Sequence, residues 1–245
     1  MSQDLITSTE AARRLGVAVS TIKRWADDGT LPCVRTAGGH RRFRPADLAV
    51  SPEEGVEAWT TLLLGDRPIL AVQGELLKLR ADRGSWPQAC SHLAQVMRTL
   101  GQRWAAGELE IHQERRASNR LAQALAQVAS TMALAPDAPV CLLVVPEGEL
   151  HTLGLSLLEP CLHELGWSTL WLGRDLPNEE IARAVRERSP DAVAASGASG
   201  LSELHARAFV EALPEDPPLL LGGSAPWPRP ALRLSALAQA LPSSL

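Results

Sequence analysis

The sequence contains few cysteines and no tyrosine. The four cysteines, Cys33, Cys90, Cys141 and Cys161, are scattered along 245 residues without a Cys-x-x-Cys pair. This spacing argues against a zinc knuckle and against a dithiol redox site. We therefore expect each cysteine to behave as a small buried apolar residue. Aromatic residues make up only 4% of the chain, and seven of them are tryptophans.

Long hydrophobic runs are also missing. No stretch approaches the roughly 20 apolar residues of a membrane-spanning helix, and the opening residues MSQDLITS lack the apolar segment of a secretion signal. We therefore expect a cytoplasmic, soluble protein that does not associate with a membrane. With 45% apolar residues the chain has ample material for packed cores, and its length suggests two or three compact units.

Charge is distributed unevenly along the chain. Residues 1–50 hold eight Lys and Arg against five Asp and Glu, which gives +3, whereas the overall net charge is −4. A basic N-terminal unit on an acidic body points to a part that binds a polyanion such as DNA.

Residues 5–50 are typical of a compact helical unit. The stretches STEAARRLGV and AVSTIKRWADDG each predict a helix that a glycine ends, and Ser20 is the expected cap of the second. Their short connection predicts a helix-turn-helix. LPCVRTAGGHRRF predicts a hairpin or wing around Gly38 and Gly39, and RPADLAV predicts a third helix with Pro45 in its first turn.

The second helix of a helix-turn-helix places its first residues at base edges in the major groove, whereas a basic wing meets phosphates. The alternative is a small helical module with a solvated basic face. The stretch ITSTEAARRLGVAVSTIKRWADDGTLPCVRTAGGHRRF resembles the winged helix-turn-helix of MerR-type transcriptional regulators, which implies binding to a double-stranded DNA operator. The predicted DNA contacts are Ser20, Thr21, Lys23, Arg24, Gly39, His40, Arg41 and Arg42, with Arg44 as a further basic residue of the wing.

The middle of the chain is predicted to be helical. Residues 69–81, 86–107 and 110–131 each carry apolar residues at three- and four-residue spacing. Together with a helix near residues 55–64 they predict a four-helix bundle. The prolines of LAPDAPV then end the helical region.

From Val140 onward, strands and helices alternate. VCLLVV, STLWLG, DAVAASG and PPLLLGG predict four buried strands, with helices between them and a closing helix in PALRLSALAQAL. Such alternation predicts a doubly wound, parallel, Rossmann-like sheet whose ligands sit at the carboxyl ends of the strands. The fold class is thus multidomain α and α/β, with predicted domains at 1–52, 53–136 and 137–245.

His151 follows the first of these strands in the stretch EGELHTLGL. Glu149 is placed to accept a hydrogen bond from one imidazole nitrogen, which would leave the other nitrogen for a metal. Gly154 would remove a side chain where a ligand passes, and the glycine-rich ends of the later strands converge on the same edge. The alternative is a histidine that simply packs or caps the following helix.

The stretch ELHTLG resembles the Asp/Glu-x-His-x-x-Gly motif of cobalamin-binding domains. The resemblance implies that His151 is the lower ligand of cobalt in place of the cofactor's own dimethylbenzimidazole. It also implies a cleft for the displaced nucleotide tail, lined by the residues of SGASG and a glycine pair, namely Ser196, Ser199, Gly222 and Gly223.

The stretch RWAAGELEIHQERRASN resembles the Trp-x9-Glu-His signature of the CarH/LitR light-sensing repressors. That resemblance implies that Trp104, Glu114 and Arg115 cover the upper face of adenosylcobalamin, and that the chain is a light-controlled repressor and not an enzyme. It further implies a homo-oligomer, a dimer or tetramer, that acts on carotenoid genes.

Two positions depart from the CarH/LitR signature. Arg115 stands where the family has histidine, and Ala105 stands where some members carry a histidine. The alternative is therefore a regulator of the same architecture that responds to another corrinoid or tetrapyrrole, or to a partner without a cofactor. A methyl-carrying corrinoid enzyme module would need only the bundle and the sheet, and residues 5–50 argue against it.

Overall fold

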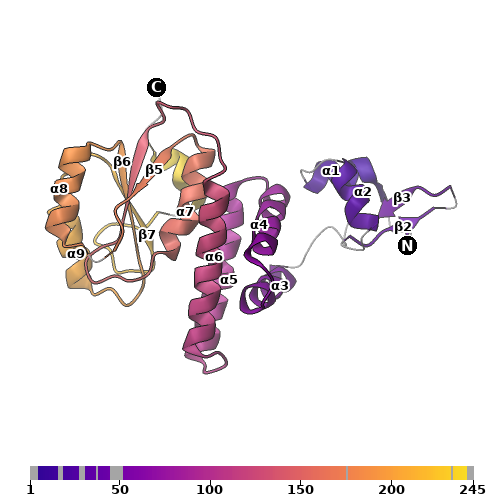
Figure 1. Ribbon diagram of the computed structural model, residues 1–245, viewed down its shortest axis with the longest axis horizontal. Coiled ribbons are helices and arrows are strands. Elements are labelled where there is room, and N and C mark those ends of the chain that lie inside the picture. The colour runs from indigo at the N-terminus through magenta and orange to yellow at the C-terminus, as the bar shows by residue number, and fades with distance from the viewer. Residues whose placement is uncertain are drawn as a thin grey trace.

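The computed structural model describes residues 5–15, 19–27, 31–36, 38–44, 52–174, 176–232 and 234–241. Figure 1 shows a small N-terminal head, a helical bundle and an α/β unit that follow one another along the chain. The predicted fold class, multidomain α and α/β, is confirmed. Among the described helices, none combines the length and apolarity needed to cross a membrane.

The head packs two helices on a small sheet. Helix α1 spans Ser8–Leu15 and α2 spans Val19–Asp27. The expected wing hairpin is present, and the sequence analysis missed a further strand that pairs with it. The antiparallel sheet, in the order β1-β3-β2, consists of β1 (Ile6–Thr7), β3 (Arg41–Phe43) and β2 (Val34–Arg35).

The core of the head is small and includes the residue with which β1 pairs. Ile6 pairs with Phe43 across the sheet, and Phe43 and Ile22 are fully buried together with Ala11. Because α2 begins at Val19, Ser20 lies in its first turn and is not the residue before it. The third helix expected at Pro45 lies outside the described residues.

The bundle contains the four expected helices, and local signals explain their ends. Gly84 ends α4 in the left-handed conformation (φ 82°), and its N–H donates to Arg80 O. Ser85 then caps α5 by accepting from Gln88 N. The helices are α3 (Pro52–Leu64), α4 (Ile69–Arg83), α5 (Trp86–Ala105) and α6 (Ile111–Ala129).

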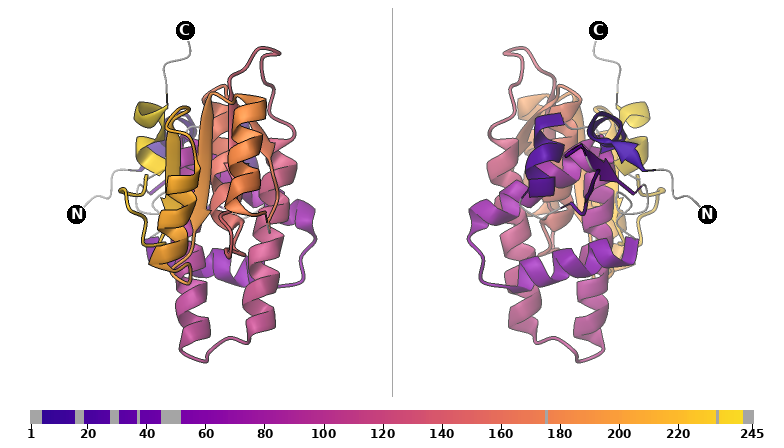
Figure 2. Two further views of the ribbon diagram at one scale, coloured as in Figure 1. Left: turned by 90° about the vertical axis from the view of Figure 1, so that its left-hand side faces the viewer. Right: turned by 90° about the vertical axis from the view of Figure 1, so that its right-hand side faces the viewer.

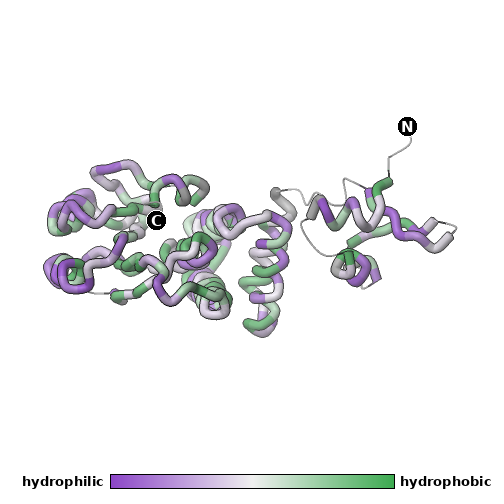
Figure 3. Tube along the Cα trace, turned by 90° about the horizontal axis from the view of Figure 1, so that it is seen from above, coloured by the Kyte–Doolittle hydropathy of each residue, from purple (hydrophilic) through white to green (hydrophobic). Residues whose placement is uncertain are grey.

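The α5–α6 hairpin is the longest element of the bundle. Gly107, with φ 76°, makes the turn, and a capping box between Glu110 and Gln113 starts α6. Both views of Figure 2 show the hairpin projecting beyond the rest of the bundle. In Figure 3, hydrophobic and hydrophilic residues alternate along the bundle helices, as expected for helices that bury one face.

The α/β unit is a four-stranded parallel sheet in the order β5-β4-β6-β7. The chain reverses its direction of winding between β4 and β6, so the doubly wound topology is confirmed. The strands are β4 (Val140–Val144), β5 (Ser168–Trp171), β6 (Ala192–Gly197) and β7 (Leu219–Gly223).

Helices cover both faces of this sheet. In Figure 1, α7 lies on the face toward the bundle, and α8 and α9 lie on the other face. The period of two along β4 produces this division, because Cys141 and Leu143 belong to one core and Leu142 and Val144 to the other. The helices are α7 (Leu153–Glu164), α8 (Asn178–Arg188) and α9 (Glu203–Ala212).

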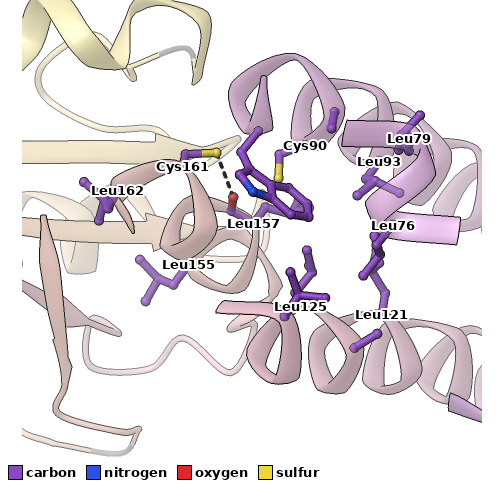
Figure 4. Packing of buried hydrophobic residues seen from close by; sticks show 14 of the residues in the cluster. Leu76, Leu79, Cys90, Leu93, Leu121, Leu125, Leu155, Leu157, Cys161 and Leu162 are labelled. Atoms are coloured by element: carbon purple, nitrogen blue, oxygen red, sulfur yellow. Dashed lines mark hydrogen bonds between the residues drawn. The ribbon is translucent and has the colours of Figure 1, made fainter. Parts of the chain in front are cut away.

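One hydrophobic core joins the bundle to the sheet. Figure 4 shows Leu157 of α7 on the side toward Leu125 of α6, and Leu121 and Leu155 belong to the same cluster. At the other end of this contact, the carboxylate of Glu164 accepts from Arg80 Nη2 at 2.6 Å and from the backbone N–H of Trp86 at 2.7 Å. The bundle and α7 therefore form one packed body, and the hydrogen bonds of Glu164 join the two at the start of α5.

The end of the chain differs from the expected closing helix. Instead of one helix over residues 230–241, the structure has a 3-10 turn at Leu234–Ala236 and the short α10 at Leu237–Ala240. Leu232 N donates to Leu221 O, so the chain first runs beside β7. Pro228 and Pro230, which disfavour a helical conformation in the residues before them, explain the late start.

Candidate cofactor site and DNA-contacting surface

His151 lies in the loop between β4 and α7, at the carboxyl end of the sheet. Its Nδ1 is 2.6 Å from Glu149 Oε1, and the same oxygen accepts from the backbone N–H of His151 at 2.8 Å. Since a carboxylate only accepts, Nδ1 carries the proton of the neutral imidazole, and Nε2 is then the nitrogen with a lone pair to donate. No other residue in the described part of the chain hydrogen-bonds Nε2, and the side chain is 61% exposed. This is the arrangement of an imidazole held ready to donate a lone pair.

Glu149 itself is almost fully buried, with 3% of its surface exposed. Its second oxygen, Oε2, accepts from the backbone N–H of Ala198 at 2.5 Å, just past the end of β6. Burial alone would raise the pKa of Glu149, but the N–H groups of Ala198 and His151 and the imidazole lower it below its usual value. The carboxylate therefore stays ionised and ties the histidine loop to the neighbouring strand.

A cavity of about 750 Å³ opens beside His151. Its floor comes from the ends of β6 and β7, and its walls come from α7, from α5 of the bundle and from the segment after β7. Most of its lining is apolar, as in many sites that take a ligand with a large organic part. The lining residues are Ser91, Ala94, Met97, Arg98, His151, Leu153, Gly154, Leu155, Leu157, Leu158, Ala195, Ser196, Gly197, Ala198, Leu220, Leu221, Gly222, Gly223, Ser224, Leu232 and Leu234.

The glycines of this site allow main chains to approach closely. A Cβ atom on Gly154 would lie 2.0 Å from Ser196 Oγ, so the start of α7 touches the end of β6. The space that the sequence analysis assigned to a passing ligand is therefore occupied by Ser196. Gly223 adopts φ 84°, and a Cβ there would lie 2.1 Å from Gly197 O. Gly222 is less crowded, with the nearest atom, Ala195 O, at 3.6 Å from such a Cβ.

Five of the ten expected cofactor residues line the cavity, and Glu149 binds His151 from just outside the lining. The other four lie elsewhere. Ser199 is exposed in the loop after β6. Trp104, at the end of α5, is 48% exposed, and Glu114 in α6 accepts from Ser118 Oγ at 2.7 Å. Arg115 is exposed. These last three residues belong to the projecting α5–α6 hairpin.

Sequence reasoning missed two features of the site. Ile111, at the start of α6, is 54% exposed although it is a large apolar residue, and it shares the hairpin with Trp104. Arg98 of α5 lines the cavity. Trp104 lies at the end of α5 and Ile111 at the start of α6, so their spacing of seven residues does not place them on one helix face. Nothing in the sequence showed that α5 would reach the ends of the strands.

On the head, the expected DNA contacts of α2 lie on one exposed face. Ser20, Lys23 and Arg24 are all exposed, while Ile22 between them is buried. Thr21 belongs to the same helix, but its side chain lies outside the described residues. The wing presents Gly39, which has φ 75°, and the exposed His40 next to it. The structure therefore offers a polar, basic helix face beside an exposed wing tip.

Arg41 of the wing is already engaged within the protein. Its Nη2 lies 2.6 Å and 2.8 Å from the two carboxylate oxygens of Asp27, at the end of α2, and Arg35 donates to the same carboxylate at 2.8 Å. Mainly through the hydrogen bond with Arg41, these cations lower the pKa of Asp27. The free phosphate contact expected for Arg41 is thus replaced here by an ion pair that holds the wing to α2, while Arg42 donates to Arg41 O at 3.2 Å.

Comparison with known proteins supports both halves of this description. A helix-turn-helix domain matches residues 5–50, and a B12 binding domain matches residues 139–240. The HTH-type transcriptional repressor CarH of Myxococcus xanthus is 26% identical over 265 residues, which cover 88% of this chain and 87% of CarH. The two domains and the similarity to CarH over most of both chains together support a CarH-like cobalamin-binding helix-turn-helix regulator.

Two further similarities are narrower. The HTH-type transcriptional repressor CarA of Myxococcus xanthus is 35% identical over 104 residues, which cover 42% of this chain and only 34% of CarA. The monomethylamine corrinoid protein of Methanosarcina barkeri has a TM-score of 0.53 at 16% identity, over 77% of this chain and 97% of that one. At that identity the likeness shows a shared fold.

The residues of this CarH-like regulator suit a corrinoid. An imidazole with one nitrogen locked on a buried carboxylate is an appropriate cobalt ligand, because the partner fixes both its tautomer and its direction. The neighbouring cavity is lined mainly by apolar residues and by small ones at the strand ends, where a flat organic group can enter.

Proposed function

We propose that this CarH-like regulator is a repressor that binds adenosylcobalamin and uses it as a light sensor to control its oligomerisation and its binding to DNA. The observation that carries the proposal is the contact between Glu149 and His151 at the mouth of the cavity. The similarity to CarH, a transcriptional repressor, over most of both chains supports the regulatory part.

Below the corrin ring, His151 would bind cobalt through Nε2, and Glu149 would hold the ring in place through Nδ1. Because Nε2 is exposed and Nδ1 is occupied, only one nitrogen is available for the metal. The displaced nucleotide tail would enter the cavity along the walls formed by Gly154, Ser196, Gly222 and Gly223. Ser199 would lie at the rim of this opening, on the exposed loop after β6.

Above the corrin ring, the projecting hairpin would provide the cover. Trp104 and Ile111 are large apolar side chains that are about half exposed, as expected of groups whose partner is a ligand. Glu114 would accept a hydrogen bond from the upper axial group, and Arg115 would lie beside it. Adenosylcobalamin supplies a cobalt–carbon bond that light breaks, so loss of the adenosyl group would remove the partner of Trp104.

The route from the cofactor to DNA would run through the bundle. Its helices share one hydrophobic core with α7, so a shift of the bundle changes the surface that a second copy of the chain meets. We propose a homo-oligomer, a dimer or tetramer, in the dark, because linked heads bind an operator about 10²–10⁴-fold more tightly than a single head. The DNA contacts would be made by the exposed face of α2 and by the wing, at carotenoid genes.

The test is reconstitution in the dark with adenosylcobalamin, followed by absorption spectra and size-exclusion chromatography before and after green light. We expect a red complex whose spectrum shows a histidine ligand on cobalt, and a change of size on illumination. His151→Ala should leave the cofactor with its own base on cobalt or weaken its binding. His205→Ala, at an exposed histidine of α9 outside the cavity lining, is the matched control. A colourless protein would overturn the proposal.

One observation favours a second candidate. Arg115 and Ala105, the two positions that depart from the CarH/LitR signature, are both exposed and both lie outside the cavity lining. A regulator of the same architecture could lack the light response and bind another corrinoid or tetrapyrrole, or respond to a protein partner. In that case the spectrum would show a bound corrinoid, or none, and illumination would leave the elution volume unchanged.

A further inference from the structure

Arg98 is a solvent-exposed arginine in the wall of a mainly apolar cavity. It belongs to α5 and lines the cavity from the bundle side, opposite the ends of β6 and β7. In the part of the chain that the structure describes, its guanidinium forms no hydrogen bond and no ion pair. The other arginines of the bundle that face a neighbouring element are engaged, as Arg80 is with Glu164 and Arg103 with Glu57.

The helix places Arg98 firmly. Its neighbours Val96 and Leu100 are fully buried in the core that joins the bundle to the sheet, so this turn of α5 cannot rotate. A long side chain on a helix leans toward the N-terminal turn, which here carries Ala94, a small residue of the same cavity wall. The guanidinium therefore has room to extend along the wall.

The chemistry of the cavity limits what this cation can meet. Among the described residues of the lining, Arg98 has the one permanent charge, and there is no carboxylate to neutralise it. Arginine binds phosphate oxygens through two parallel N–H donors, and such charge-assisted hydrogen bonds are about twice as strong as neutral ones. A cavity of this kind suits a ligand with an apolar ring and one anionic group.

We infer that Arg98 recognises the phosphodiester in the nucleotide tail of the corrinoid and so makes the site selective for complete cobalamins over tail-less corrinoids. The inference rests on the proposed corrinoid site and goes beyond it, because it assigns a source of selectivity to the bundle side of the cavity. The apolar walls accept the base of the tail, and Arg98 pairs with its single negative charge.

The experiment compares cobalamin with cobinamide, which has the same corrin ring but neither nucleotide nor phosphate. Equilibrium binding is followed by absorption in buffer without phosphate, for the wild type, Arg98→Met, Arg98→Lys and the control Arg188→Met, an exposed arginine of α8 on the other face of the sheet. Methionine keeps most of the apolar stem of the side chain and removes the charge together with the N–H donors of the guanidinium.

We expect Arg98→Met to weaken cobalamin binding about five- to tenfold and to leave cobinamide binding within about twofold, because only cobalamin offers a charged partner. Arg98→Lys should recover part of the loss, and added salt should weaken the wild type more than Arg98→Met. Inorganic phosphate should compete with cobalamin in the wild type and not in Arg98→Met.

The outcomes separate this inference from the proposed function. Equal affinity changes for cobalamin and cobinamide in Arg98→Met, or no change for either, would overturn the role of Arg98 while leaving the corrinoid site intact. Failure of the wild type to bind either corrinoid would overturn the proposed function and the role of Arg98 with it.

Discussion

Gly154 and Ser196 touch across the start of α7 and the end of β6, where a Cβ atom on Gly154 would lie 2.0 Å from Ser196 Oγ and 2.9 Å from Ser196 Cβ. Neither the backbone of a helix nor that of a buried strand moves easily. The pair therefore fixes how closely the helix approaches the sheet at the mouth of the cavity.

Replacing Gly154 by alanine tests this contact. We expect Gly154→Ala to lower the free energy of unfolding by about 1–3 kcal/mol, as overpacking of a well-filled site does. Chemical denaturation followed by circular dichroism measures the change. In the double variant Gly154→Ala/Ser196→Gly both clashing atoms of residue 196 are gone, so most of the loss should be recovered. Additive losses in the double variant would contradict the contact.

The buried carboxylate of Glu149 predicts a pH dependence of stability. Its pKa is lower in the folded protein than in the unfolded chain, so it stabilises the fold above the unfolded value, which is about 4.3 for glutamate. This contribution is lost as the pH falls through the lower, folded pKa.

Glu149→Gln should therefore be less stable than the wild type at neutral pH, and the difference should shrink below about pH 4.3. Because the amide no longer orients the imidazole, corrinoid affinity should also fall, by about 10–100-fold. Unfolding curves at several pH values and a corrinoid titration measure the two effects. Glu179→Gln, at an exposed position in α8, is the control. A constant difference between wild type and variant at all pH values would contradict the assignment.

We expect the ion pairs of Asp27 to lower the affinity for random DNA and to increase the selectivity for the operator. Its carboxylate holds Arg41 and Arg35, so Asp27→Asn releases two cations and loosens the wing. We expect stronger binding to random DNA, with a salt dependence steeper by about one phosphate contact. Specific binding should gain less, because the wing is no longer fixed. Fluorescence anisotropy with operator and random duplexes over a range of salt measures both, and Asp137→Asn is the control. A fall in random binding would show that the ion pair is needed on DNA.

The exposed face of α2 predicts a residue that reads sequence. Arg24 is exposed and forms no ion pair in the described part of the head. Arg24→Ala should weaken operator binding by about 1–3 kcal/mol if its guanidinium meets a base edge. Binding to random DNA should fall much less. Arg188→Ala, in the α/β unit, should change neither. Equal losses of affinity for both duplexes would contradict this role and indicate that Arg24 contacts the phosphate backbone.

The cysteines predict an order of chemical reactivity. Cys90, Cys141 and Cys161 are fully buried, and burial raises the pKa of Cys141 to about 12. Cys33 in the head is partly exposed. Alkylation of the native protein followed by mass spectrometry should therefore modify Cys33 first, and the other three should react only in denaturant. Early modification of Cys90 would show that the bundle opens from α7.

The sequence was most informative where one periodicity ran over many residues. The helices α4, α5 and α6 and the four strands of the sheet were all expected, because their apolar residues repeat with periods of about 3.6 and 2 or form short continuous runs. It was least informative where pairing across the chain decides the structure. Strand β1 has two residues, and only its pairing with Phe43 makes it a strand.

The same limit applies to the site. The motif around His151 predicted the hydrogen bond to Glu149, because the partners are only two positions apart in the chain. The bond from Ala198 to Glu149 joins residues that are 49 apart, and the place of Arg98 in the cavity depends on how α5 packs beside α7. Arg41 was predicted to contact DNA phosphate, and its ion pair with Asp27 was not foreseen because Asp27 lies on another element, α2.

The hydrogen bonds of Glu164 hold the start of α5, whereas Trp104 lies near the other end of this helix. Glu164 fastens the chain at Trp86, and Trp104 lies 18 residues further along the same unbroken helix, about 27 Å away at 1.5 Å per residue. A tilt of α5 by about 10° around its fastened end would carry the indole through about 5 Å at that length. A small change in the direction of α5 near Trp86 would thus displace Trp104 by about the length of a side chain.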